Sequence, residues 1–308
     1  MAERSLVFLS ADTLYAEEKS SRHPLLLVDD EPLVDALAQR DYAVTFADWM
    51  TTPPRMLDGA TVLVRTPWNY TDHLEAFETW IREAEDASVR LINPAALLLG
   101  TLRKTYLMDL PRLGVPAIPT LPFEPGPGGL ADTDEALAHA RAAFRTDSLV
   151  IKPAVGAGAR NTVLLRSPAA EAPAHAGALA ALPQDQDYLV QPFVPEIETA
   201  GEISVVFFGG RFAHMVQKRP KAGDFRVQTE HGGHTTSLVP DRMVVARAAR
   251  ASALFADPAY IRVDGVVTEQ GFLVMELEMI EPELFFGFAP DSATLFADVL
   301  AGLLGDRE

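Results

Sequence analysis

Short apolar runs alternate with amphipathic segments over the first 95 residues. The apolar runs at 5–10, 42–46, 59–64 and 89–92 predict strands, and the helical periodicity of Glu31–Arg40 and Leu74–Ala87 predicts helices between them. Strands that alternate with helices indicate a parallel α/β unit. Because no glycine-rich phosphate fingerprint follows any of these strands, a dinucleotide site of the Rossmann type is not expected.

The pattern changes after residue 95. Ala95–Leu113 predicts a single helix, and Ser148–Lys152 predicts a strand with a lysine at its end. Tyr188–Phe193 predicts another strand, broken at its proline. Further on, strands are predicted at 202–208 and 211–217 around a Gly-Gly turn, and helices at 134–144, 243–255 and 290–304. Hairpins in this half of the chain indicate a mixed α+β architecture.

An acidic hairpin is predicted between residues 261 and 278. Asp264 lies in its first strand, and Glu276 and Glu278 follow the second strand at a spacing that places both on one face. Carboxylates among apolar residues are costly to bury unless a cation neutralises them. Carboxylate oxygens suit Mg²⁺ or Mn²⁺, so we expect a metal site. An amphipathic hairpin with a solvated acidic face is the competing interpretation.

Two basic features accompany this hairpin. Lys152 precedes a loop of small residues, 156–159, which is able to bring backbone amides close to a phosphate. The loop does not match the Walker pattern. Residues 211–226 form a local basic segment that holds Arg211, Lys218, Arg219, Lys221 and Arg226 against Asp224. These features favour a small anionic ligand.

The segment 65–70, RTPWNY, follows a predicted strand. Ligands of open α/β sheets lie beyond the carboxyl ends of the strands, so Arg65 is placed to face a substrate carboxylate, with Asn69 close by. The competing interpretation is structural: Trp68 and Tyr70 pack under a loop with Arg65 stacked on them.

Composition narrows the classes of function. The chain has 308 residues, enough for about two domains, and its net charge of −17 disfavours nucleic acid or an anionic membrane as a partner. The absence of cysteine excludes disulfides and thiolate chemistry. With no signal peptide or long apolar segment, a cytoplasmic protein is expected. His231 and His234 lack a third partner at zinc spacing, and no G-x-S-x-G motif is present.

The order of these parts resembles the ATP-grasp superfamily, most closely the glutathione-synthetase-like carboxylate–amine ligases. The resemblance rests on a lysine before the central region, the strand-end lysine with its small-residue loop, the Q-P-F-V segment, the K-x-P…R-x-Q…G-G run and the D…E-x-E set. The strings VMELEMIEPEL and RTPWNY are similar to a subgroup that includes the ATP-dependent cyclo-ligase of D-cycloserine biosynthesis. The resemblance implies an N-terminal pre-ATP-grasp domain (1–105) followed by a two-lobed ATP-grasp unit (106–187 and 188–308).

The resemblance also implies roles for individual residues. Residues expected to bind ATP are Lys104, Lys152, Gln191, Phe193, Val194, Glu202, Gly232 and Gly233. Lys218 and Arg226 are expected to stabilise phosphoryl transfer and the acyl phosphate, and Asp264, Glu276 and Glu278 to bind two Mg²⁺ ions. Three positions depart from the glutathione synthetase pattern or its relatives, namely Gln228, Glu278 and Glu283.

The function expected from this resemblance is an ADP-forming ligase. It would activate a small carboxylate as an acyl phosphate for attack by an amine, either between two molecules or within one. The alternatives are a small-molecule kinase on the same scaffold and an ATP-binding regulatory protein without turnover. Small-molecule substrates are the expected partners, and association as a homodimer is left open.

Overall fold

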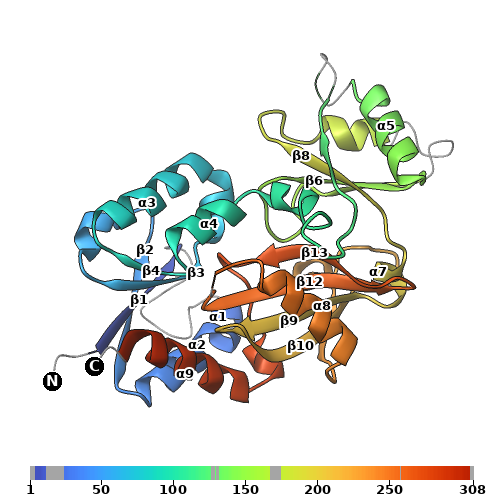
Figure 1. Ribbon diagram of the computed structural model, residues 1–308. Helices are drawn as coiled ribbons and strands as arrows, with labels where there is room; N and C mark the ends of the chain where they lie inside the picture. Colours follow the sequence, from blue (N-terminus) through green and yellow to red (C-terminus); the bar gives the residue numbers. More distant parts are fainter. Residues whose placement is uncertain are drawn as a thin grey trace.

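The computed structural model describes residues 4–11, 24–125, 129, 132–166, 175–256 and 258–305. Three sheets frame this part of the chain (Figure 1). The first sheet is parallel, with strand order β2-β1-β3-β4, and consists of β1 (Arg4–Ser10), β2 (Tyr42–Asp48), β3 (Thr61–Thr66) and β4 (Arg90–Ile92). The predicted parallel α/β unit is therefore confirmed.

The other two sheets are antiparallel. The smaller has the order β5-β8-β6-β7 and consists of β5 (Leu121–Phe123), β6 (Leu149–Pro153), β7 (Val163–Leu165) and β8 (Tyr188–Pro192). The larger has the order β11-β10-β9-β12-β13 and consists of β9 (Glu202–Phe208), β10 (Arg211–Arg219), β11 (His234–Ser237), β12 (Tyr260–Thr268) and β13 (Gly271–Glu278). Since β8 pairs within the smaller sheet, that sheet extends past the predicted boundary at residue 187.

Helices cover these sheets by burying one face each. The helices are α1 (Pro24–Val28), α2 (Asp30–Ala38), α3 (Leu74–Asp86), α4 (Ala95–Thr101), α5 (Asp134–Phe144), α7 (Glu196–Thr199), α8 (Arg242–Ser252) and α9 (Asp291–Gly305). In α3, Phe77, Trp80, Ile81 and Ala84 are buried, at the spacing that places them on one side. Within the described residues, no helix combines the length and the apolar character needed to cross a membrane.

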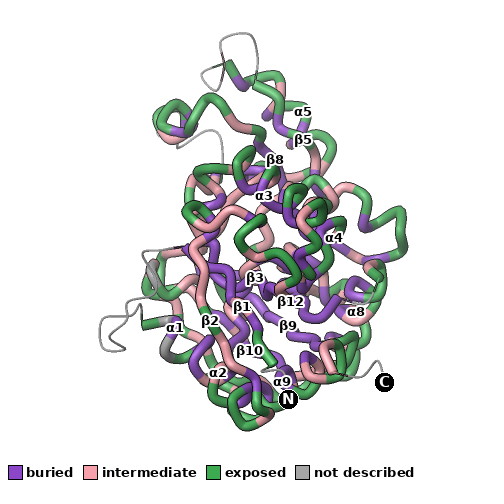
Figure 2. Tube along the Cα trace, turned by 90° about the vertical axis from the view of Figure 1, so that its left-hand side faces the viewer, coloured by how far each residue is buried: buried purple, intermediate pink, exposed green. Residues whose placement is uncertain are grey.

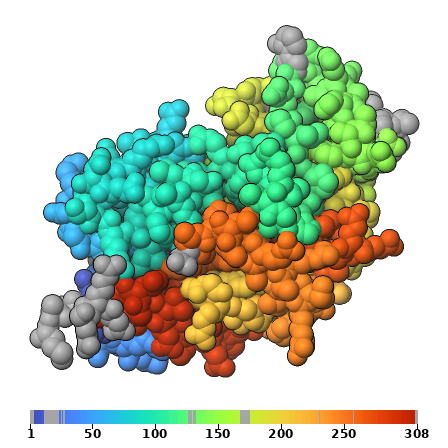
Figure 3. Space-filling view, viewed as in Figure 1, coloured from blue at the N-terminus to red at the C-terminus, as the bar shows by residue number. Residues whose placement is uncertain are grey.

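Short 3-10 helices connect several of these elements. They are η3 (Pro54–Leu57), η4 (Trp68–Asp72), η5 (Lys104–Met108), η6 (Thr229–His231) and η7 (Phe286–Phe288). Figure 3 shows how the elements group in space: the green lobe of the smaller sheet stands above the orange strands of the larger one, and the red C-terminal helix lies below the cyan-to-teal part that carries α3 and α4, with blue atoms of the N-terminal part beneath it.

One hydrophobic core joins the parallel sheet to the larger antiparallel sheet. It contains Phe8 of β1, Phe208 of β9 and Phe296 of α9, all fully buried. The rings of Phe208 and Phe296 stack with their centroids 4.4 Å apart. Figure 2 shows this buried zone as the purple segments of β1, β3, β9 and β12. The C-terminal helix therefore packs back against the N-terminal part, and the two sheets keep a fixed relation to one another.

The single helix predicted over 95–113 is wrong. Helix α4 ends at Thr101, Arg103 is extended (φ −105°, ψ 125°), and η5 begins at Lys104. The backbone N–H of Lys104 donates to the carbonyl oxygen of Ala154 at 2.7 Å instead of continuing the helix. This tertiary hydrogen bond decides where the Lys104 side chain points.

Asn93 connects the parallel sheet to the larger antiparallel sheet. Its Nδ2 donates to the carbonyl oxygens of Tyr260 and Met279, each at 3.0 Å, and its Oδ1 accepts from the backbone N–H of Ala259 at 2.7 Å. The side chain is fully buried. Because water cannot replace a lost partner at such a site, this amide is required for stability.

We expect Asn93→Ala to lower the free energy of unfolding by about 2–4 kcal/mol, since it leaves buried backbone groups without partners. Urea denaturation followed by circular dichroism measures this loss. Gln270→Ala, at an exposed turn position, is the control and should change stability by less than about 0.5 kcal/mol. Equal stability of the two variants would contradict a bridging role for Asn93.

Candidate active site

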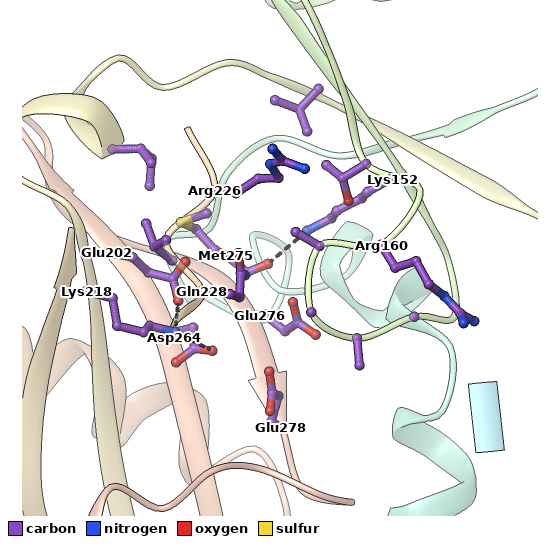
Figure 4. A pocket seen from close by; sticks show the side chains of 18 of the residues that line it. Lys152, Arg160, Glu202, Lys218, Arg226, Gln228, Asp264, Met275, Glu276 and Glu278 are labelled. Atoms are coloured by element: carbon purple, nitrogen blue, oxygen red, sulfur yellow. Dashed lines mark hydrogen bonds and ion pairs between the residues drawn. The ribbon is translucent and has the colours of Figure 1, made fainter. Parts of the chain in front are cut away.

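A cavity of about 410 Å³ opens between the two antiparallel sheets and the η4 segment. Its lining combines charged side chains from β6, β9, β10, β12 and β13 with apolar ones from the connection after β8. Figure 4 shows labelled side chains that point into this space from both sheets. The cavity therefore collects residues that lie far apart in the sequence.

The acidic hairpin forms one wall. Asp264 of β12 lies opposite Glu276 of β13, and a bulge follows in which Met275 is the extra residue. The bulge lets Glu276 and Glu278 line the cavity while Leu277 remains buried in the core behind the sheet. Gly265 is required beside the bulge, because a Cβ there would lie 2.4 Å from the carbonyl oxygen of Leu273.

Arg262 pairs with two carboxylates of this wall. Its Nη2 lies 2.8 Å from an Asp264 oxygen and also pairs with Glu278, and its Nη1 donates to the carbonyl oxygen of Glu283 at 3.0 Å. Ser204 donates to Asp264 at 2.6 Å. Burial would raise the pKa of Asp264, but Arg262 and Lys218 lower it to about 2. Asp264 is therefore ionised, and its oxygens are already hydrogen-bonded.

Lys218 and Glu202 lie directly opposite each other on β10 and β9 and form an ion pair. The Nζ of Lys218 is also 3.7 Å from Asp264. Burial disfavours the ammonium, yet Asp264 and Glu202 together raise the pKa of Lys218 above its ordinary value. Lys218 therefore stays charged in a mostly buried position at the inner end of the cavity.

Two further lysines converge on the hairpin. The Nζ of Lys104 lies 2.8 Å from Glu276 and donates to the carbonyl oxygen of Gly156. The Nζ of Lys152 lies 3.4 Å from the carbonyl oxygen of Met275, and within the described residues it has no carboxylate partner. Burial lowers the pKa of Lys152 to about 8. Lys152 is thus a desolvated cation that can accept an anionic ligand.

The small-residue loop closes over the cavity. Arg160 at its end pairs with Asp72 and lies near the hydroxyl of Thr71, both in η4. On the other side, His231 Nε2 is 3.2 Å from the carbonyl oxygen of Gly158. The loop is therefore held between the N-terminal part and the segment that precedes β11.

The apolar side of the cavity comes from the end of β8. Phe193 and Val194 line it, and the Arg166 guanidinium lies over the Phe193 ring at 5.1 Å. Gln191 also lines the cavity, with its Nε2 donating to Thr120 Oγ1 at 2.8 Å. A flat apolar ligand group would fit against this side.

Arg226 and the Gly-Gly pair lie at the margin. Arg226 forms a two-pronged ion pair with Asp224 at 2.8 and 3.0 Å, and its side chain is 37% exposed. Gly232 and Gly233 do not line the cavity; they close the turn between η6 and β11. A Cβ on Gly233 would lie 2.0 Å from the Val227 carbonyl oxygen. The expected phosphate-side role of the glycines is not supported, because they serve turn geometry.

Arg65 and Asn69 do not line the cavity, so the structure does not bring them to the substrate contacts predicted for them. Arg65 is 1% exposed and pairs with Asp29 at 3.0 Å and Asp30 at 2.7 Å. Asn69 accepts a hydrogen bond from Trp49 Nε1 at 2.6 Å and donates to Met50 Sδ. Both side chains are satisfied by partners in the N-terminal part, which are buried for Arg65 and partly exposed for Asn69.

Several cavity residues were missed by sequence reasoning. Arg262 carried a signal, since it lies two residues before Asp264 and so shares its strand face. Glu281 and Phe285, which also line the cavity, follow β13 in an irregular segment where no periodicity exists to predict their direction.

Known proteins resemble this chain in sequence and fold. The family model described as D-cycloserine synthetase DcsG, N-terminal domain, matches residues 14–93. The cycloserine biosynthesis protein DcsG of Streptomyces lavendulae is 30% identical over 282 residues, which cover 89% of this chain and 93% of that protein. The chain belongs to the DcsG family of ATP-grasp ligases.

Solved structures agree with this assignment. The crystal structure of D-cycloserine synthetase DcsG matches with a TM-score of 0.78 at 27% identity, covering 97% of this chain and 99% of that one. The D-alanine–D-alanine ligase of Bacillus anthracis, at 13% identity and a TM-score of 0.65 over 98% and 97% of the two chains, shares the fold. The predicted ATP-grasp fold and ATP-dependent carboxylate–amine ligase activity are confirmed.

ATP-grasp ligases use ATP and Mg²⁺, and the donor chemistry of this ligase fits the metal. Glu276 and Glu278 present carboxylate oxygens to the cavity with 23% and 25% of their side chains exposed. The described residues contain no group of acidic or histidine side chains that is already arranged around one ion. All three carboxylates have a cationic partner, but the Asp264 side chain is only 4% exposed, so Glu276 and Glu278 are the more accessible candidates of the predicted set.

We expect Lys152→Ala to weaken ATP binding about 10- to 100-fold, because a charge-assisted contact contributes roughly 1.5–3 kcal/mol. Burial holds the pKa of Lys152 near 8, below the ordinary value, so the ammonium is present at lower pH and is lost as pH rises through 8. ATP affinity of the natural protein should therefore fall between about pH 7 and 9, and the variant should lack this component.

Isothermal titration calorimetry with ATP across that pH range measures both effects. Lys221→Ala removes an exposed lysine outside the cavity lining and is the matched control. An unchanged dissociation constant in Lys152→Ala would remove Lys152 from the nucleotide site.

Proposed function

We propose that this ligase activates a small amino-acid-type carboxylate with ATP and joins it to a nitrogen of the same molecule. The observation that carries the proposal is the convergence of Lys104 and Lys152 on the acidic strand β13, in one cavity closed by the 156–160 loop. Kinship with D-cycloserine synthetase over 89% of the chain supports ring closure within one substrate.

The chemistry has two balanced steps. A carboxylate oxygen attacks the γ-phosphorus of ATP; a new O–P bond forms, the bond to the β-phosphate oxygen breaks, and ADP leaves. The nitrogen then attacks the acyl carbon, a C–N bond forms, the acyl C–O bond breaks, and phosphate and a proton are released. Because two anions must first approach each other, the site must supply positive charge.

The cations of the cavity are proposed to divide this work. Lys152 and Lys104 face the phosphates, Lys218 lies at the inner end, and Arg226 stands at the margin, where its fork can turn from Asp224 to a substrate carboxylate or acyl phosphate. Glu276 and Glu278 would hold Mg²⁺, which would supply further positive charge for phosphoryl transfer. Two ions with Asp264 as a further ligand, or Mn²⁺ in their place, remain predictions.

The remaining lining is proposed to hold the nucleoside and exclude water. Phe193, Val194 and Gln191 line the side suited to adenine, and Glu202 is proposed to meet the ribose hydroxyls. The 156–160 loop, held at Asp72 by Arg160, shields the acyl phosphate from hydrolysis. The predicted division into three parts, with boundaries at residues 105 and 187, stays a proposal. Because β8 pairs within the smaller sheet, we place the second boundary after β8.

A hydroxylamine trap tests the proposed reaction. With ATP, Mg²⁺ and a panel of amino-acid carboxylates, we expect ADP release and hydroxamate formation for the accepted substrate, because hydroxylamine intercepts an acyl phosphate. Without hydroxylamine, mass spectrometry should show a product formed from one substrate molecule. A stable phosphorylated product without hydroxamate would identify a kinase, and a product of two joined molecules would exclude ring closure.

We expect Glu276→Gln to remove most of the rise in melting temperature that Mg²⁺–ATP causes, since that rise measures ligand binding to the native state. The unliganded variant should also melt lower, because Lys104 loses its buried partner. Thermal melts with and without Mg²⁺–ATP measure both quantities. Glu269→Gln, on the exposed turn of the same hairpin, is the control; a wild-type response in Glu276→Gln would refute its metal role.

A further inference from the structure

We propose that Asp29 and Arg65, in the N-terminal part, are positioning residues that hold the cavity wall 282–286 and act through it on Arg262. Neither side chain lines the cavity, and both are buried. The inference rests on the proposed function, because the wall they hold faces the proposed reaction site.

The first link joins the buried ion pairs to the wall's backbone. Asp29 Oδ2 accepts from the N–H of Leu284 at 2.7 Å, and its Oδ1 accepts from the N–H of Phe286 at 3.2 Å. Arg65 Nη1 donates to the carbonyl oxygen of Pro282 at 3.2 Å. A carboxylate accepting from alternate residues fixes the peptide between them, so the direction of residue 285 is set from the N-terminal part.

A second anchor comes from the larger sheet. His214 of β10 is buried, and its Nε2 lies 2.9 Å from the carbonyl oxygen of Leu284, to which it donates as the Nε2–H tautomer. Leu284 is thus held at both its N–H and its C=O. The wall is irregular in conformation but has few free backbone groups, which makes it rigid.

The second link joins the wall to the charged centre. Phe285 adopts a left-handed conformation (φ 57°), which is costly for a non-glycine residue and persists only where its surroundings impose it. Its ring faces the Lys218 ammonium at 5.8 Å and the Arg262 guanidinium at 5.4 Å. The neighbouring carbonyl oxygen of Glu283 accepts from Arg262 at 3.0 Å.

The two links form one continuous path. From Arg65 and Asp29 the contacts lead through the wall to Arg262, and from Arg262 to Asp264 and Glu278. Apolar residues would stabilise the interior as well as a buried ion pair does, so stability alone does not account for these charges. A positioning role does account for the charges of Asp29 and Arg65: they fix the Arg262 guanidinium among its carboxylates, and small displacements near reacting groups reduce rates strongly.

The test is Asp29→Asn, which keeps the side chain's size but replaces one accepting oxygen with a donor that faces a backbone N–H. We expect kcat/KM for the carboxylate substrate to fall about 10- to 100-fold while the ATP dissociation constant changes less than about 2-fold. Hydrogen exchange should quicken at residues 284–288 and stay unchanged in the parallel sheet. The control is Asp298→Asn, which breaks the exposed pair with Arg40 and should leave all three measurements as in the natural protein.

Phe285→Leu tests the far end of the path and leaves the N-terminal part intact. We expect a fall in kcat without a change in ATP binding, because Leu lacks the ring face that contacts both cations. Asp29→Asn with a lower melting temperature but unchanged kcat/KM and unchanged exchange at 284–288 would overturn the proposal, as would wild-type kinetics in Phe285→Leu. Failure of the proposed function would appear instead in the natural protein, as absence of hydroxamate, and the exchange measurement would still decide the positioning role.

Discussion

Burial of carboxylates on β12 and β13 is the constraint on which the rest of the site depends. A carboxylate taken out of water destabilises the fold unless a cation and hydrogen bonds compensate it. Arg262 does this for Asp264, whose pKa it lowers to about 2, whereas burial and the neighbouring carboxylates still raise the pKa of Glu278 to about 8 although Arg262 pairs with it. Lys104 and Lys218 pair with Glu276 and Glu202. The acidic strand can therefore face a partly buried cavity in a chain whose net charge is −17.

The same pairing leaves one cation for the ligand. Lys152 lies beside these pairs with only a carbonyl oxygen near its Nζ among the described residues, and burial lowers its pKa to about 8. An anionic phosphate would stabilise its ammonium form and supply the partner that it lacks. An ATP-grasp ligase needs such a cation, because the substrate carboxylate and the ATP phosphates repel each other unless fixed positive charges lie between them.

Arg65 and Asn93 of the N-terminal part do not line the cavity, but they hold in place the segments that do. Asn93 fastens the start of β12 and the end of β13, and Arg65 with Asp29 fastens the segment that follows. The shared core around Phe208 and Phe296 makes these attachments rigid. The cavity is therefore bounded by parts of the chain that are distant in sequence but belong to one packed interior.

Periodicity and residue type determined much of this protein in advance. The strands of the parallel sheet, the acidic hairpin and the position of Lys152 at a strand end just before a small-residue loop follow from local pattern, because side-chain alternation within a strand needs no distant partner. The break after Thr101 and the inward turn of Arg65 were decided only by tertiary contacts. Each depends on a partner far along the chain: Ala154 for Lys104, and Asp29 and Asp30 for Arg65. A buried polar group takes whichever partner packing brings to it, and a single sequence does not specify that partner.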